Sequence, residues 1–393
     1  MLVLGIALAH GALRRPVSSS GRPPTPLATQ DAGRYVETEH HLNGEGDAAL
    51  AMSNPVLIEV TRGPLVESFH RGSLVVVTPD GTQVAALGDI SRPIFPRSAI
   101  KSLQCLPLIE TGAADRYGFG TAEIALACAS HTGTPRHAEL AAKMLADVGL
   151  DEPALGCGAH MPLGSSAQKA LIRSGQDPSQ LHNNCSGKHA GMLATAMHLG
   201  EPVEGYWKPD HPVQKRVHAT LCELTGLTLN RDVMGYDGCS LPNWAMPLGS
   251  LARLFARFVT KSGMGPERRR AVDRILQSCW AAPELVAGPG RADTVVMRKL
   301  PGRIFMKTGA EGVYAGGFPA LGLGFALKID DGTTRASAGA VVALIERVIP
   351  ESKGLMERRT IKTWRGMEAG EIRAAPALER VLDELQAAVK VMA

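Results

Sequence analysis

Short apolar runs rich in β-branched residues lie toward both ends of this chain, and most are bounded by glycine, proline or aspartate. Such runs predict β-strands. The turn Pro79-Asp80-Gly81 joins two of them into a predicted hairpin, and Asp330-Asp331-Gly332 predicts a turn after the last. The predicted strands are residues 56–60, 73–78, 84–87, 304–307, 313–318 and 322–328.

The middle of the chain follows the helical period instead. Thr134-Pro135 is a favourable helix start, and Gly200 is a favourable helix end. A helix after Pro96 is predicted to end or kink at Pro107. The other predicted helices are 134–148, 188–199, one opening at 210–212, 248–259, 267–279, 337–348 and 375–392. Strands at both ends around a helical middle predict an α+β fold, with one sheet built from both ends of the chain and a helical cluster packed on it.

Residues 1–52 differ from the remainder in composition. The stretch from Ser18 to Pro26 is rich in serine and proline, as in loops and linkers. We therefore interpret residues 1–52 as a disordered extension or a mis-assigned start, with Met52 a sensible first residue. Residues 53–393 are predicted to form a single catalytic domain.

Composition narrows the class of protein. Hydrophobic residues make up 45% and charged residues 20% of the 393 residues, which is typical of a soluble globular protein. The net charge of +4 and the 4% aromatic content, without a basic run, argue against a nucleic-acid partner. No apolar run reaches 18 residues, so no membrane-spanning helix is predicted. The odd number of cysteines, seven, favours reduced thiols and a cytoplasmic location.

The first candidate for chemistry is Ser98 with Lys101. Residues three apart on a helix share a face, and a desolvated lysine can accept the proton of a serine hydroxyl. The pair therefore predicts acyl transfer without a catalytic histidine. Ser166 and Lys169 have the same spacing, so the pattern also arises by chance in this chain.

Two later motifs strengthen the first pair. Lys307-Thr308-Gly309 follows a predicted strand, and Ser130 lies between it and Ser98 in sequence. This order matches that of penicillin-binding proteins and class A β-lactamases, which combine Ser-x-x-Lys with a later Lys-Thr-Gly. Ser130 could relay a proton to a leaving amine. His131 stands where those enzymes carry aspartate, and we interpret it as a structural residue.

A third group of candidates contains thiols. Cys185, Lys188 and His189 lie at neighbouring helical positions, and Cys239 belongs to Asp237-Gly238-Cys239, which follows a further short segment predicted as a strand. Two thiolates with an amine or imidazole would suit Zn²⁺. Buried free cysteines also serve as small apolar residues, so the spacing alone leaves both interpretations open.

Taken together, these motifs resemble the L-asparaginase II family, the rhizobial-type inducible asparaginases. The resemblance extends over about residues 53 to 345 and rests on five ordered segments. They are residues 97–101, 128–131, 184–192, Tyr206 with 210–212, and 237–242. It implies a fold like that of serine β-lactamases and penicillin-binding proteins, with an antiparallel sheet. It also implies hydrolysis of L-asparagine to L-aspartate and ammonia, and a homodimer.

The resemblance further implies two Ser/Lys pairs, Ser98 with Lys101 and Ser130 with Lys307. It implies a zinc site formed by Cys185, Lys188 and Cys239. Which serine attacks the substrate stays open.

The zwitterionic substrate requires charges of both signs. Arg97 could bind its α-carboxylate, Asp237 its α-ammonium group, and His189 could orient either. Arg97 and His189 could instead be structural, and Asp237 could orient a zinc ligand.

Three other functions remain to be distinguished at this point. A glutaminase of the same fold differs only by one methylene in its substrate. A β-lactamase would be expected to carry Ser-Asp-Asn at the middle motif. A non-catalytic zinc- or ligand-binding protein would be expected to have lost one of the serines or lysines, and all four are present.

Overall fold

The computed structural model describes residues 53–355 and 360–392, so the predicted extension 1–52 lies outside the described residues. Its central element is an antiparallel sheet in the order β11-β12-β1-β2-β10-β9-β8, with β3 also paired to β2. The strands are β1 (Val56–Arg62), β2 (Leu65–Val77), β3 (Gln83–Leu87), β8 (Phe305–Thr308), β9 (Val313–Phe318), β10 (Leu323–Ile329), β11 (Thr360–Lys362) and β12 (Glu368–Ala374).

Pairing of β2 with β10 joins the two ends of the chain. Val75 lies opposite Ala326, and both side chains are fully buried. The α+β class and the antiparallel sheet built from both ends are thereby confirmed. Apolar runs at both ends made this sheet predictable, because each run could be buried only against another layer.

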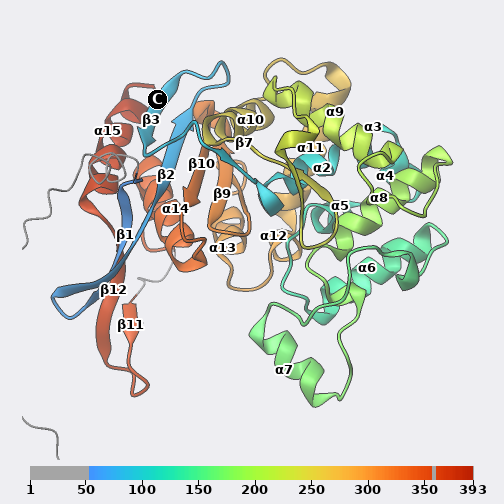
Figure 1. Ribbon diagram of the computed structural model, residues 1–393, viewed down its shortest axis with the longest axis horizontal. Helices are drawn as coiled ribbons and strands as arrows, with labels where there is room; N and C mark the ends of the chain where they lie inside the picture. Colours follow the sequence, from blue (N-terminus) through green and yellow to red (C-terminus); the bar gives the residue numbers. More distant parts are fainter. Residues whose placement is uncertain (1–52, 356–359, 393) are drawn as a thin grey trace, which may run out of the picture. The chain divides into compact units, whose positions relative to one another are not determined.

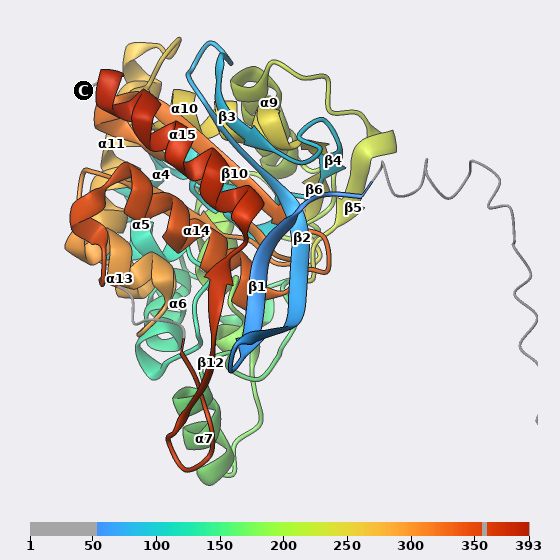
Figure 2. The same ribbon diagram turned by 90° about the vertical axis from the view of Figure 1, so that its left-hand side faces the viewer.

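Helices cover both faces of the sheet. α14 (Thr334–Val348) and α15 (Pro376–Met392) pack on one face, and α10 (Leu248–Thr260) packs against β9 and β10 from the other (Figures 1 and 2). Gly324 allows α10 to approach closely, since a Cβ atom there would lie 2.2 Å from the carbonyl oxygen of Ala252. Close contact of this kind fixes the sheet against the helices.

The remaining helices form a cluster beside the sheet (Figure 1). They are α2 (Lys101–Gln104), α3 (Leu106–Glu110), α4 (Ala113–Arg116), α5 (Thr121–Ala127), α6 (Pro135–Asp147), α7 (Ser165–Arg173), α8 (Ser186–Leu199), α9 (Pro212–Thr225), α11 (Pro266–Ala281), α12 (Pro283–Val286) and α13 (Ala292–Lys299). Two short sheets connect loops here: β4 (Pro93–Ile94) with β7 (Met246–Pro247), and β5 (Met234–Tyr236) with β6 (Pro242–Trp244).

Several boundaries differ from the sequence predictions. The helix after Pro96 is divided into the 3₁₀ turn η1 (Arg97–Ile100), α2 and α3. The break falls at Cys105, and Pro107 lies in the first turn of α3, where its missing N–H costs nothing. Strand β2 begins at Leu65 rather than at residue 73, because its first half is exposed and lacks a buried apolar pattern.

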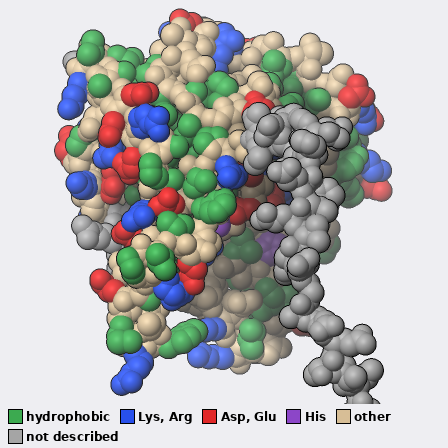
Figure 3. Space-filling model, turned by 60° about the vertical axis from the view of Figure 1, so that its left-hand side comes forward, with side chains coloured by type: hydrophobic (Ala, Val, Ile, Leu, Met, Phe, Trp, Pro, Cys, Tyr) green, Lys and Arg blue, Asp and Glu red, His purple; other side chains and the backbone are tan. Residues whose placement is uncertain are grey.

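The described surface carries charges of both signs. Lysine and arginine side chains are interspersed with aspartate and glutamate on the face shown in Figure 3. Within residues 53–355 and 360–392, no helix is both long enough and apolar enough to cross a membrane.

Candidate active site

Ser98 lies in a strained turn at the start of the helical cluster. The residue before it, Arg97, has a φ of +52°, a left-handed conformation that costs a non-glycine residue about 1 kcal/mol or more. Arg97 Nε donates to Asp237 Oδ1 at 2.8 Å, which stabilises this conformation. Ser98 is 8% exposed, and its hydroxyl has no hydrogen-bond partner among the described residues. The turn thus presents a hydroxyl that is available to a substrate.

Lys101 follows Ser98 by one turn and is fully buried. Its Nζ donates to the carbonyl oxygens of Ala129, at 2.7 Å, and of Asn184, at 3.3 Å. These carbonyls belong to the residue before Ser130 and the residue before Cys185. Lys101 therefore connects three segments that are distant in sequence.

Ser130 lies just after α5 and is held by both its main chain and its side chain. Its N–H donates to the Val286 carbonyl at 2.9 Å, and its Oγ accepts a hydrogen bond from Asn184 Nδ2 at 2.8 Å. Ser130 is therefore held next to Ala129, whose carbonyl oxygen accepts from Lys101 Nζ.

Lys307, at the end of β8, is also fully buried. Burial lowers the pKa of its ammonium group to about 7; Asp293 opposes the shift, and the charge of Lys101 adds to it. Its Nζ donates to the Thr308 carbonyl at 3.1 Å. At neutral pH, Lys307 can therefore both give and accept a proton.

Asp293 in α13 supports the end of this strand. Its carboxylate accepts hydrogen bonds from the Thr308 N–H at 2.7 Å and from the Tyr314 hydroxyl at 2.8 Å. A Cβ on Gly309 would lie 2.7 Å from the Pro96 carbonyl oxygen, so this strand end contacts the turn that carries Ser98. Glycine is what allows the Lys-Thr-Gly segment to reach that turn.

Cys185, Lys188 and Cys239 are brought together at the start of α8. Lys188 Nζ donates to Cys239 Sγ at 3.2 Å, and the Cys185 thiol forms a hydrogen bond with Cys239. This hydrogen bond, together with the charge of Lys188, holds the pKa of Cys239 well below its usual range despite burial. The same contact and burial raise the pKa of Cys185 to about 12. The arrangement is a Cys239 thiolate between a thiol and an ammonium group.

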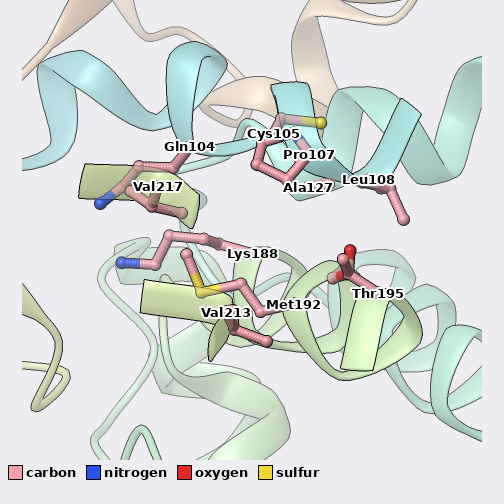
Figure 4. A pocket seen from close by; sticks show the side chains of 11 residues that line it. Gln104, Cys105, Pro107, Leu108, Ala127, Lys188, Met192, Thr195, Val213 and Val217 are labelled. Carbon is pink, nitrogen blue, oxygen red and sulfur yellow. The ribbon is translucent and has the colours of Figure 1, made fainter. Parts of the chain in front are cut away.

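The aliphatic part of Lys188 borders a small cavity (Figure 4). Its volume is about 10 Å³, and Gln104, Met192 and Val217 are among its other lining residues. A space of this size holds about one water molecule. It is therefore too small for an amino-acid substrate.

His189 provides an unused hydrogen-bonding group. The Tyr206 hydroxyl accepts from the Gly156 N–H at 2.9 Å and lies 2.5 Å from His189 Nδ1, so it donates to that nitrogen. Nε2 then carries the ring proton, and it is buried without a partner among the described residues. Burial and the charge of Lys188 lower the pKa of His189 to about 3, which keeps the ring neutral. A buried, unpaired N–H is a reason to expect a ligand here.

Arg97 and Asp237, the two predicted contacts of the substrate's charged groups, are paired with each other. Burial alone would raise the pKa of Asp237, but Lys188 and Arg97 outweigh burial and lower it. Asp237 also accepts from the Gly238 N–H at 2.9 Å, and Ser240 adopts a φ of +71° in the same turn. The ion pair between Arg97 and Asp237 thus connects the turn that carries Ser98 to the loop that carries Cys239.

Other residues singled out in the sequence lie apart from these groups. Ser166 and Lys169 are exposed on α7, as expected of a chance match. His131 accepts from the Gly133 N–H at 3.1 Å and lies 3.0 Å from Ser186 Oγ. Its ring also stacks on His137, which agrees with a structural role.

Sequence reasoning missed Asn184 and Asp293 as supporting residues. Asn184 opens the segment 184–192 that carries the family resemblance, but no motif assigned its side chain a contact with Ser130. Asp293 lies 15 residues before its main-chain partner, Thr308, in a helix that was not predicted.

The segments that carry Ser98, Ser130, Lys101 and Lys307 thus contact one another on an α+β scaffold. The sequence matches the family model of L-asparaginase II over residues 58–374, and the protein belongs to this family. It is thus an asparaginase-type amidohydrolase that acts on a small-molecule substrate.

Comparison with solved structures gives more distant similarities. A β-lactamase from Mycobacterium bovis shows 13% identity and a TM-score of 0.38, covering 71% of this chain and 94% of that chain. D-alanine carboxypeptidase AmpC from Burkholderia cenocepacia shows 13% identity and a TM-score of 0.32, covering 68% and 90%. None of the curated proteins matches the sequence.

Proposed function

We propose that the protein is an L-asparaginase that hydrolyses the side-chain amide of L-asparagine to L-aspartate and ammonia. The observation that carries the proposal is the position of Lys101. Its amine is held by carbonyls beside Ser130 and Cys185, while its own turn carries Ser98. This arrangement supports the cooperation of a nucleophile, a base and a second serine around one substrate.

Lys101 is the proposed base for Ser98. To act as the base, Lys101 must be in its amine form, which has two N–H donors for the two carbonyls that accept from this nitrogen and one lone pair. The lone pair is then left for the Ser98 proton. Ser98 Oγ attacks the amide carbon and forms a C–O bond, which leaves a negative charge on the former carbonyl oxygen.

Ser130 and Lys307 are proposed to complete the release of ammonia. Ser130 donates its proton to the amide nitrogen as the C–N bond breaks, and Lys307 supports this transfer with a pKa near 7. Water then hydrolyses the aspartyl ester at Ser98. Arg97, Asp237 and His189 are proposed to bind the charged groups of the substrate, with the Arg97–Asp237 ion pair opening to receive them.

Zinc is proposed to bind at Cys185, Lys188 and Cys239. Two sulfur donors and an amine in mutual contact fit the preference of Zn²⁺ for thiolate and nitrogen ligands. Residues 53–355 and 360–392 contain no cluster of three or more histidine, cysteine, aspartate or glutamate side chains suited to a metal. The third protein donor would therefore be Lys188. A bound zinc ion would supply a fixed positive charge near the substrate.

Cys239→Ser is expected to lower the amount of bound zinc to a small fraction of that in wild type. It is also expected to raise KM for asparagine about tenfold, because changes at metal sites typically cost tenfold or more in affinity or activity. Metal analysis by mass spectrometry and asparagine titration measure the two effects. Cys222→Ser is the matched control, because Cys222 lies outside the cluster in α9. Wild-type zinc content and KM in Cys239→Ser would contradict the proposed metal site.

Ammonia release from L-asparagine, L-glutamine and D-asparagine, with and without added zinc, tests the proposed activity. We expect kcat/KM for L-asparagine to exceed that for L-glutamine by about 10- to 200-fold, the usual discrimination for one methylene. A preference for glutamine would indicate the glutaminase alternative, and cleavage of nitrocefin a β-lactamase. Tight asparagine binding without ammonia release would indicate a non-catalytic binding protein.

A homodimer and a cytoplasmic location complete the proposal. Both follow from the expectations set out for the sequence, and sedimentation at several protein concentrations tests the first.

A further inference from the structure

We infer that Asn184 is a positioning residue that sets the direction of the Ser130 hydroxyl, so that its hydrogen is available to the leaving group. This inference rests on the proposed function, because it concerns the proton that Ser130 donates.

The direction of one hydrogen bond is the first argument. Asn184 Nδ2 lies 2.8 Å from Ser130 Oγ, and an amide nitrogen can only donate. Ser130 Oγ is therefore the acceptor in this contact. The hydroxyl hydrogen must point away from Asn184, toward whatever occupies the space beside Ser130.

The Asn184 side chain and main chain make further contacts beside Ser130. Its Oδ1 lies 3.6 Å from Cys185 Sγ. Its main-chain N–H donates to His160 Nε2 at 3.1 Å, while His160 Nδ1 lies 2.7 Å from the Met161 carbonyl oxygen and donates to it. The Asn184 amide oxygen also lies 3.3 Å from His160 Nε2, so this side chain lies between His160, Cys185 and Ser130.

Asn184 also contacts the proposed base. Its carbonyl oxygen accepts from Lys101 Nζ at 3.3 Å, so one residue contacts the group that takes the first proton and the group that gives the second. The next residue, Cys185, is one of the three proposed zinc ligands, with Lys188 and Cys239. Asn184 thus contacts both Lys101 and Ser130 and adjoins Cys185, so it sets the spacing between these three residues.

Asn184→Asp tests the inference, because it preserves size and replaces the donor by an acceptor. The Ser130 hydrogen would then turn toward the new carboxylate and away from the substrate. We expect kcat for asparagine to fall about 100-fold, the lower range of general acid–base contributions, with KM changed less than about threefold.

Asn183→Asp is the matched control in the same turn. Asn183 Nδ2 donates to the carbonyls of Cys157 and Gly158, at 2.9 and 2.8 Å, and its Oδ1 accepts from the Cys185 N–H at 2.8 Å, so its side chain makes no hydrogen bond with Ser98 or Ser130. Loss of these bonds should lower the melting temperature, while kcat per folded molecule stays within about threefold of wild type. The opposite pattern, with Asn184→Asp unstable but catalytically intact, would overturn the inference.

A double-mutant comparison separates positioning from a general structural effect. If Asn184 acts through Ser130, adding Asn184→Asp to Ser130→Ala should lower the single-turnover rate of excess enzyme no further. If the double variant is slower than Ser130→Ala by the same factor as Asn184→Asp is slower than wild type, the inference is overturned. Wild-type protein that releases no ammonia would instead refute the proposed function, and the two failures are thereby distinguished.

Discussion

Ser98→Ala is expected to lower kcat for ammonia release from L-asparagine by at least about 10³-fold, as removal of a nucleophile does in other serine hydrolases. The physical reason is that no ester can form without the Ser98 oxygen. KM should change little, because the hydroxyl contributes little to ground-state binding. An ammonia-coupled assay at saturating asparagine measures the effect.

Ser102→Ala is the matched control for this substitution. Ser102 lies in α2, is fully buried, and its hydroxyl has no partner among the described residues. Removing an unpaired buried hydroxyl is close to neutral or stabilising, so this variant should keep wild-type activity. Equal losses in Ser98→Ala and Ser102→Ala would indicate a packing effect, and full activity in Ser98→Ala would refute its role as nucleophile.

The second large effect concerns the pH dependence of stability. The pKa of Lys307 falls from an ordinary value of 10.5 to about 7 in the folded protein. Between these values the unfolded chain binds the extra proton, so this lysine makes the free energy of unfolding rise with pH. The contribution is greatest above pH 10.5 and is lost as pH falls toward 7.

Lys307→Met should remove this slope. The difference in unfolding free energy, wild type minus variant, is expected to rise by about 1.4 kcal/mol per pH unit between pH 7 and 10, or roughly 4 kcal/mol in total. Urea unfolding at several pH values measures it, with Lys169→Met on the exposed face of α7 as control. A difference that is flat with pH would mean that Lys307 is charged in the folded protein at these pH values.

The sequence was most informative where burial leaves a simple pattern. Strands such as β9 and β10 are buried along nearly their whole length, so continuous apolar runs identified them. The hairpin of β11 and β12 was missed, because exposed charged residues such as Glu368, Glu371 and Arg373 interrupt its pattern. In the structure β12 pairs with β1, more than 300 residues away in sequence, and no local pattern indicates that pairing.

The candidate site was predictable in composition but not in its connections. Ser98, Lys101, Ser130 and Lys307 were all identified from motifs. The contacts of Lys101 Nζ with the carbonyls of Ala129 and Asn184 depend on where distant loops meet. The pairing of Arg97 with Asp237 likewise joins residues 140 positions apart, which spacing along the chain could not indicate.

Trapping the covalent intermediate tests the central claim most directly. Enzyme turning over L-asparagine is quenched with acid, digested and analysed by peptide mass spectrometry. Our account predicts one aspartyl group on the peptide that carries Ser98, absent from Ser98→Ala and from a control incubated with L-aspartate. An aspartyl group on the Ser130 peptide, with Ser98 unmodified throughout turnover, would contradict it.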